Sequence, residues 1–306
     1  MNPLFNKIED NGEVYELYAL RYATTRNRSA KQNFLITHDI HDTPMPMDFY
    51  VWFAVCGERV IMIDGGAHET TVRARGHEFL RCPAQAMTEL GFRPESVTDL
   101  IVSHMHWDHM GNVDKFPNAR LHIHKTEMAF ATGCDMCQPL LQRPYDVEQV
   151  CQVVRALYGG RVNFNEGECA IAPGIGAHHV GGHAPGLQVV TVRTRRGVVV
   201  LASDALHFYE NLTRDNPFSV VVDVPDYLRA FGTLARLAAS PEHIVPGHDP
   251  LVLRLYPPAS DAWAGEAVRL DAVPSQPTPL AGLRGGFKMP EQIVEEYSSR
   301  SCRQRV

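Results

Sequence analysis

The sequence predicts a layered α/β fold, and three features support this prediction. Short apolar runs rich in aromatic and β-branched residues recur along the chain and are typical of buried strands. Segments with helical periodicity lie between some of these runs. Several runs end in an acidic residue or a histidine beside small residues, as is expected where strand ends carry a site. We therefore expect alternating strands and helices around one core.

Seven apolar runs are expected to form strands. They lie at residues 14–24, 49–55, 60–64, 100–104, 188–192, 198–204 and 243–248. The sequence RTRRG at residues 193–197 separates two of them and predicts a short hairpin turn that ends in Gly197.

Two segments have the periodicity of amphipathic helices. The first, residues 146–160, begins at a capping residue, Asp146, and ends at Gly159. Its expected buried face consists of Val147, Val150, Cys151, Val154, Leu157 and Tyr158. The second, residues 226–240, follows Pro225, and its expected face consists of Leu228, Phe231, Leu234, Leu237 and Ala238.

The C-terminal segment is rich in proline and is not expected to form one regular element. Its prolines are Pro257, Pro258, Pro274, Pro277, Pro279 and Pro290. We divide the chain into a main domain, residues 1–256, and a C-terminal arm, residues 257–306, with a short helix near 290–299. The arm is expected to pack on the main domain or on a partner subunit, so a homodimer stays open.

Composition narrows the class of protein and its partners. The chain has 306 residues, of which 44% are hydrophobic and 21% charged, as in ordinary globular proteins. Its formal net charge of -6 argues against a surface for nucleic acid. No apolar run is long enough to span a membrane, and the N-terminus shows no export signal. The seven cysteines follow no disulfide pattern, so we expect reduced thiols in the cytoplasm.

Residues 104–109, with the sequence HMHWDH, gather three histidines and an aspartate in six positions. Imidazole and carboxylate groups are the ligands that zinc takes when thiolates are absent. His104 and His106 would point the same way in an extended stretch, and Asp108 and His109 follow after a turn. Four ligands this close would crowd one tetrahedral ion, whereas two ions can share them.

Three distant residues complete the expected site. His183, Asp204 and His248 each lie in a turn at or near a predicted strand end. We assign His104, His106 and His183 to one Zn²⁺. We assign Asp108, His109 and His248 to a second Zn²⁺. Asp204 and a water or hydroxide are expected to bridge the pair, as in dinuclear sites.

These motifs resemble the metallo-β-lactamase superfamily, and most of all the dinuclear zinc N-acyl homoserine lactone lactonases and the pyridoxolactonase-like enzymes. The resemblance covers roughly residues 14–255 and rests on HMHWDH with the following Gly111, GGHAPG (181–186), LASDA (201–205) and PGHD (246–249). It implies an αββα sandwich of two mixed sheets flanked by helices, with the metals at one edge. It also implies hydrolysis by a metal-bridging hydroxide, so residues 1–256 would form the hydrolase domain.

The resemblance also implies roles for individual residues. Asp108 would carry a proton to the leaving oxygen, Asp204 would bridge the metals, and Asp64 would accept a hydrogen bond from a ligand imidazole. The lactone lactonases carry a tyrosine three residues after the bridging aspartate, to contact the substrate carbonyl. This chain has His207 there and Tyr209 two residues later, and either could take that role.

The leading functional hypothesis is a zinc hydrolase that opens a small lactone. Hydrolysis of another ester, a thioester or a cyclic amide is the nearest alternative. An iron-dependent oxidoreductase and a non-catalytic metal-binding protein are weaker ones. An apolar groove for an acyl chain would draw on Met45, Met47, Phe49, Trp52, Trp107, Phe116, Met136 and Phe218. We interpret His122, His124, Cys134 and Cys137 as structural residues, and leave His178 and His179 open.

Overall fold

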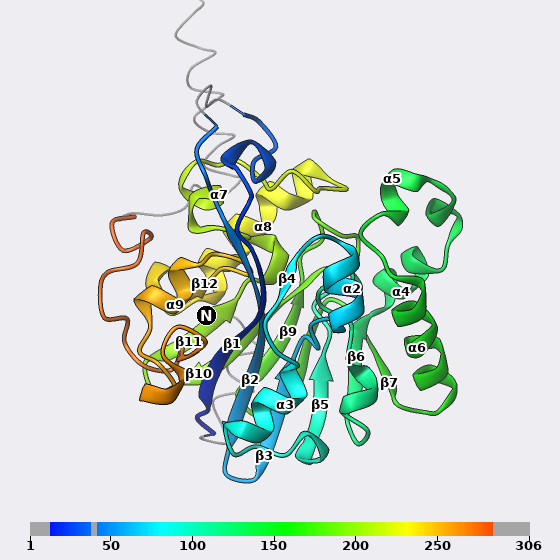
Figure 1. Cartoon of the computed structure of the whole chain (residues 1–306), viewed down its shortest axis with the longest axis horizontal. Helices are drawn as coiled ribbons and strands as arrows, with labels where there is room; N and C mark the ends of the chain where they lie inside the picture. The colour runs from blue at the N-terminus through cyan, green and yellow to red at the C-terminus, as the bar shows by residue number, and fades with distance from the viewer. Residues whose placement is uncertain (1–12, 38–41, 284–306) are drawn as a thin grey trace, which may run out of the picture.

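Two β-sheets form the centre of the computed structural model, which describes residues 13–37 and 42–283 (Figure 1). The first sheet has the strand order β13-β1-β2-β3-β5-β6-β7, with β4 paired to β1. Its strands are β1 (Glu16–Thr25), β2 (Met47–Cys56), β3 (Arg59–Ile63), β4 (Glu78–Phe79), β5 (Val97–Ile101), β6 (Arg120–His124), β7 (Val162–Asn165) and β13 (Ala267–Arg269). Strands β3, β5, β6 and β7 run parallel, and the other pairs are antiparallel, so the sheet is mixed.

The second sheet has the order β12-β11-β10-β9-β8. Its strands are β8 (Glu168–Ala172), β9 (Ile175–His179), β10 (Gln188–Thr194), β11 (Gly197–Leu201) and β12 (Ile244–Val245). The predicted hairpin joins β10 to β11 through the pair Thr194 and Gly197. Only β11 and β12 pair in parallel, so this sheet is mixed as well.

Helices flank the two sheets (Figure 1). The helices beside the first sheet are α2 (Glu69–Ala74), α3 (Pro83–Glu89), α4 (Lys125–Ala131), α5 (Pro139–Gln142) and α6 (Val147–Tyr158). Those beside the second sheet are α7 (Tyr209–Thr213), α8 (Val224–Leu237) and α9 (Leu251–Leu255). The arrangement confirms the predicted αββα sandwich.

Every predicted strand run contains a strand, but β3 ends one residue earlier than predicted and three other strands end three residues earlier. β5 ends at Ile101, β11 at Leu201 and β12 at Val245, so His104, Asp204 and His248 lie in the loops that follow. β2 is buried along nearly its whole length, because the central strand of a covered sheet packs on both faces. The core therefore holds the strand ends rigidly and leaves the loops to present side chains.

Both predicted helices are present, but their predicted buried faces are partly wrong. In α6, Val147 and Tyr158 are 70% and 89% exposed, and the buried residues are Gln149, Val153 and Ala156. The amide of Gln149 donates to the carbonyl oxygen of Trp107 at 2.8 Å. This buried polar contact helps to set which face of α6 points inward, and the hydrophobic periodicity of the sequence does not indicate it.

Helix α8 begins two residues earlier than predicted. Asp223 caps it by accepting from the backbone N–H of Asp226 at 2.7 Å, and Pro225 lies inside the first turn. Leu228 is 42% exposed, while Tyr227 and Ala230 are buried. The other buried residues of this face, Phe231, Leu234 and Leu237, match the prediction.

The described part of the proline-rich segment, residues 257–283, lies against the main domain. Its strand β13 pairs with β1, with Tyr18 opposite Arg269. Trp263 and Leu280 are buried. The separate arm stays a prediction, and the helix predicted near 290–299 lies outside the described residues. Among the described helices, none combines the length and the apolar character that crossing a bilayer requires.

Candidate metal centre

Four loops after β3, β5, β11 and β12, together with the turn between β9 and β10, carry the expected site. Two backbone hydrogen bonds join the first pair of loops, from Gly65 N–H to the carbonyl of His109 and from Gly111 N–H to that of Gly66, both at 2.7 Å. The backbone N–H of His248 donates to the carbonyl of His207 at 3.0 Å. The loops are therefore fixed to one another before any ligand side chain is considered.

Glycine at positions 65 and 111 permits the close approach of the first two loops. A Cβ atom at residue 65 would lie 2.1 Å from the carbonyl oxygen of Gly111, and one at residue 111 would lie 2.7 Å from Cα of Ala67. Both contacts are with backbone, so no side-chain movement could relieve them. Gly111 therefore permits the close packing of the loops after β3 and β5.

The structure brings the seven predicted ligand side chains together in two groups. Ligand atoms of His104, His106, His183 and Asp204 lie within 4.8 Å of one another. Those of Asp108, His109 and His248 form a second group, whose ligand atoms also lie within 4.8 Å of one another. All seven residues are buried.

Asp204 lies between the groups, and its two oxygen atoms face different histidines. Oδ1 is 2.9 Å from Nε2 of His248 and 3.2 Å from Nε2 of His109. Oδ2 is 3.1 Å from Nε2 of His183 and 3.7 Å from Nε2 of His104. One carboxylate therefore serves both groups, each through its own oxygen.

Two imidazole nitrogens in the cluster have no hydrogen-bond partner. They are Nε2 of His104 and Nε2 of His109, both buried. In addition, Nε2 of His183 lies 2.9 Å from Nδ1 of His106. Buried polar atoms are seldom left unpaired, and cations bound by these imidazole nitrogens would satisfy them. The donor set therefore fits divalent metal ions.

Burial and charge set the protonation of these groups. Burial, together with the neighbouring imidazoles, lowers the pKa of His104 and of His106 well below its usual value and keeps both rings neutral. Burial by itself would raise the pKa of Asp204, but the surrounding imidazoles lower it well below its usual range. Neutral imidazole and ionised carboxylate are the forms that bind metal.

The far ring nitrogens of three ligand histidines contact oxygen atoms. Nδ1 of His109 lies 2.7 Å from Oδ2 of Asp64, the contact expected from the sequence. Nδ1 of His183 lies 2.8 Å from the carbonyl of Val220, and that of His248 lies 2.8 Å from the carbonyl of Asp48. Such contacts orient the rings and fix which nitrogen faces the metal.

His207 and Tyr209 occupy very different surroundings. Nε2 of His207 lies 3.0 Å from Oδ2 of Asp204, and its ring stacks on Phe218 with 3.6 Å between centroids. It also forms a group with Asp204 and His248 whose ligand atoms could hold a metal. Tyr209 is fully buried beside Tyr256, outside the cavity lining. Tyr209 is therefore wrong as a substrate contact, because α7 turns its ring into the core.

A cavity of about 670 Å³ opens onto the cluster. Of the apolar residues considered for a groove, Met47, Phe49, Trp107 and Phe218 line it. The other four, Met45, Trp52, Phe116 and Met136, do not, and Trp52 and Phe116 lie fully inside the core.

Sequence reasoning missed three kinds of residue around this site. The buried hydroxyl of Ser203 donates to that of Ser103 at 2.9 Å. Tyr22 donates to the carbonyl of Asp108 at 2.7 Å. Arg28, Arg75 and Arg143 line the cavity. Apart from Ser203, which belongs to LASDA, none of these lies within a ligand motif, so only tertiary structure reveals their contacts.

The other histidines and cysteines considered in the sequence analysis lie outside the cluster. His122 contacts Asp99 at 2.7 Å, and His124 stacks on His179 with 3.9 Å between centroids, as suits structural residues. His178 contacts the hydroxyl of Thr191 at 2.9 Å. Cys134 and Cys137 are exposed free thiols in a short 3-10 helix.

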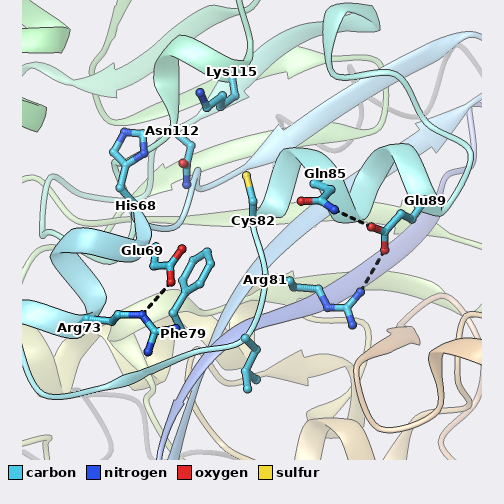
Figure 2. Close-up of a pocket in the computed structure, with 11 residues that line it drawn as sticks. His68, Glu69, Arg73, Phe79, Arg81, Cys82, Gln85, Glu89, Asn112 and Lys115 are labelled. Atoms are coloured by element: carbon cyan, nitrogen blue, oxygen red, sulfur yellow. Dashed lines mark hydrogen bonds and ion pairs between the residues drawn. The ribbon is translucent and has the colours of Figure 1, made fainter.

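A second cavity, of about 560 Å³, lies beside α2, β4 and α3. Figure 2 shows that two of its arginines, Arg73 and Arg81, each pair with a glutamate. Arg73 contacts Glu69 at 2.7 Å, and Arg81 contacts Glu89 at 3.3 Å. This cavity contains none of the predicted ligands.

Residues 50–248 match the metallo-beta-lactamase superfamily. Because this match spans more than half of the 306 residues, the chain belongs to that superfamily. It is a hydrolase of the αββα fold with a cluster of metal-type ligands.

Curated relatives narrow the comparison to one activity. N-acyl homoserine lactonase AiiB of Agrobacterium fabrum is 27% identical over 215 residues, which are 59% of this chain and 74% of that protein. An N-acyl homoserine lactonase of Bacillus cereus is 28% identical over 134 residues, 44% of this chain and 48% of that protein. The chain thus matches about half the length of the Bacillus relative.

Solved structures share the fold at lower identity. A quorum-quenching N-acyl homoserine lactone lactonase aligns with a TM-score of 0.63 and 22% identity, covering 78% of this chain and 93% of that one. AidC, described as a dizinc quorum-quenching lactonase, aligns with a TM-score of 0.60 and 18% identity, covering 79% and 92%. These alignments show the fold.

Proposed function

We propose that the protein is a dinuclear zinc hydrolase that opens the ring of a small lactone of the N-acyl homoserine lactone type. The position of Asp204 is the observation that carries this proposal. Its two oxygens face two separate groups of imidazole and carboxylate ligands, as a bridge between two ions requires. The lactonase relatives support the choice of a lactone over other substrates.

The ligand assignment follows the two groups. His104, His106 and His183 would hold one Zn²⁺, and Asp108, His109 and His248 the other, with Asp204 shared. When bound, two zinc ions lower the pKa of water toward neutrality and polarise the carbonyl of the lactone.

His207 is suited to donate a hydrogen bond to the substrate carbonyl. Nε2 of His207 lies 3.0 Å from the ionised carboxylate of Asp204, which can only accept, so Nε2 carries the proton and Nδ1 is left to accept from the Tyr227 hydroxyl at 3.2 Å. Burial lowers the pKa of His207 well below its usual value and keeps the ring neutral. The proton then resides on Nε2, which faces the cluster, and a fixed donor there stabilises negative charge that develops on the carbonyl oxygen.

Asp108 is suited to move the proton of the reaction. It is 8% exposed and lines the cavity beside the cluster. Its carboxylate would take a proton from the attacking water and return it to the ring oxygen as the C–O bond breaks. Asp108 and His207 therefore act on the leaving oxygen and the carbonyl oxygen respectively.

Two finer expectations extend this proposal. We place the protein in the cytoplasm as a zinc enzyme with reduced thiols, since its six described cysteines are free. A homodimer through the C-terminal segment is the second, and light scattering of the purified protein would measure it.

A substrate panel tests the proposed activity. It contains acyl homoserine lactones, simple γ-lactones, a thiolactone, an open-chain ester and a lactam, each incubated with and without chelator. We expect lactones to gain one water by mass only in the zinc-loaded sample, and elemental analysis to give two zinc ions per chain. Oxygen consumption by an iron-loaded sample, with no lactone opened, would replace this function by an oxidoreductase.

A further inference from the structure

Three arginines line the wall of the metal cavity, although the chain as a whole is acidic. Arg28 lies in the loop between β1 and β2, Arg75 at the end of α2, and Arg143 at the end of α5. Arg28 and Arg75 are half-buried and Arg143 is exposed. Segments far apart in the sequence thus bring three positive charges to one cavity.

The contacts of Arg28 and Arg75 are with neutral groups. Arg28 donates to the side-chain oxygen of Asn33 and, at 2.8 Å, to the carbonyl of Gln32. Arg75 donates to the carbonyls of Arg143 and Tyr145, both at 3.0 Å. Among the ion pairs of the described residues, none includes Arg28, Arg75 or Arg143.

Aromatic rings hold two of these guanidinium groups in fixed positions. Arg28 lies 5.2 Å from the ring centroid of Phe218, and Arg75 lies 5.0 Å from that of Trp107. Both rings line the same cavity. Such stacking, with the carbonyl contacts, orients the planar groups before a ligand arrives, which lowers the entropic cost of binding.

In the cavity beside α2, β4 and α3, by contrast, arginines pair with carboxylates. There Arg73 and Arg81 each contact a glutamate (Figure 2). In the metal cavity none of the described carboxylates forms an ion pair with the three arginines, although the charge of Asp108 acts on Arg28 and Arg75 and that of Asp146 on Arg75. Burial and the charge of Arg143 lower the pKa of Arg28 to about 10, so the group still carries its charge at neutral pH. An anion from solution would relieve the repulsion between Arg28 and Arg143 and use the free guanidinium N–H groups.

We propose that the substrate carries an oxyanion group, a carboxylate or a phosphate, which Arg28, Arg75 and Arg143 bind while the ester bond lies at the metal centre. This inference rests on the proposed lactone hydrolysis and changes its substrate class from the neutral N-acyl homoserine lactones to lactones that carry an anionic group. The reaction is unchanged: a water oxygen joins the carbonyl carbon, the ring C–O bond breaks, and the ring oxygen takes the proton. The oxyanion serves only to place the ring.

Matched lactones test the inference with the zinc-loaded protein. One pair is a γ-butyrolactone with a ring carboxylate and its primary amide. The other is a hydroxymethyl-γ-butyrolactone and its phosphate monoester. We expect kcat/KM to favour the charged member of at least one pair by about tenfold or more. The pair that shows the preference identifies the oxyanion. Raising salt from about 0.05 to about 0.5 M should reduce only the charged member's kcat/KM.

Arg143→Gln is the first variant, because this exposed side chain supports no described contact. Arg28→Gln is the second. Each should reduce kcat/KM for the charged substrate severalfold more than kcat/KM for the neutral one. Arg73→Gln, which removes an arginine from the second cavity, is the matched control and should change neither.

Binding provides a readout that does not depend on turnover. Hydrolysis of the carboxylate lactone yields a dicarboxylate, so glutarate and its monoamide are suitable probes in calorimetry. Glutarate should bind more tightly to the zinc-loaded protein, and Arg143→Gln should abolish the difference. Equal binding of the two probes, or equal turnover within both lactone pairs, would overturn the anion site while the lactonase stands. Failure to open any lactone, neutral or charged, would instead overturn the proposed function.

Discussion

The carboxylate of Asp64 holds the imidazole of His109 from behind, with 2.7 Å between Oδ2 and Nδ1. The same carboxylate accepts from the backbone N–H and the hydroxyl of Ser103, at 2.7 and 2.8 Å. A carboxylate can only accept, so Nδ1 of His109 must donate, and the lone pair of Nε2 is left to face the cluster. Asp64 thus selects the tautomer of a proposed ligand without entering the cavity.

Replacing Asp64 with Asn should weaken metal binding. The amide keeps the volume and tolerates the left-handed backbone at this position, where φ is 58°. It cannot accept all three hydrogen bonds, so His109 loses its fixed tautomer. We expect zinc affinity to fall about 10–100-fold, measured by competition with a chromophoric chelator.

Asp99→Asn is the matched control for Asp64→Asn. Asp99 contacts Nε2 of His122 at 2.7 Å, the same pair of groups at the same distance but outside the cluster. This variant should leave zinc affinity unchanged. Equal losses in the two variants would mean that Asp64 acts on overall stability rather than on His109.

Two glycine substitutions should have opposite effects on stability. Gly111→Ala places a methyl group 2.7 Å from backbone atoms of residues 66 and 67, so the two loops must separate. We expect a loss of about 2–4 kcal/mol in the free energy of unfolding. Gly232→Ala lies in α8 with open space around its Cβ and should gain about 0.5–1 kcal/mol. Urea unfolding measures both, and a stable, zinc-replete Gly111→Ala protein would contradict the close approach.

His207→Phe separates a substrate contact from a metal ligand. The phenyl ring retains the stacking on Phe218 and removes both nitrogens. If His207 donates to the substrate, kcat should fall about 10²–10³-fold with two zinc ions still bound. Loss of one zinc ion would instead show that His207 is a ligand, as its position near Asp204 and His248 permits. Tyr227→Phe should lower kcat less and leave the zinc content intact.

The proposed ligands could be predicted from the sequence because each carries its own local signal. His104, His183, Asp204 and His248 all follow or adjoin a strand run beside glycine, alanine, serine or proline, and the core then brings those strand ends together. The same runs predicted a layered α/β fold, and the resemblance to the metallo-β-lactamase superfamily implied the αββα order. A local sequence pattern was therefore sufficient to predict residues that are recognised by their type and by their position at a strand end.

Other features depend on contacts between distant segments and leave no local signal. The inward face of α6 depends on Gln149 meeting the carbonyl of Trp107. The orientation of His183 depends on the carbonyl of Val220, which any residue could supply. The arginines of the cavity come from three separate loops. These features follow from contacts in the folded structure, so residue type alone does not predict them.

His124 should make the protein less stable in mild acid. Burial, and then the charges of His179 and Lys125, lower its pKa in the folded protein to about 4, against a usual value of 6.5. The unfolded chain therefore takes up a proton at a higher pH than the folded one, and stability is lost as pH falls from about 6.5 to about 4. We expect a loss of about 1–2 kcal/mol in the free energy of unfolding between pH 7 and pH 5. His124→Asn keeps an acceptor for the N–H of Thr126, at the start of α4, and removes the titration. Urea unfolding at pH 7 and pH 5, in the same metal state, should show a smaller acid-induced loss for the variant. An identical loss in both proteins would assign the acid sensitivity to other groups, the ligand histidines first among them.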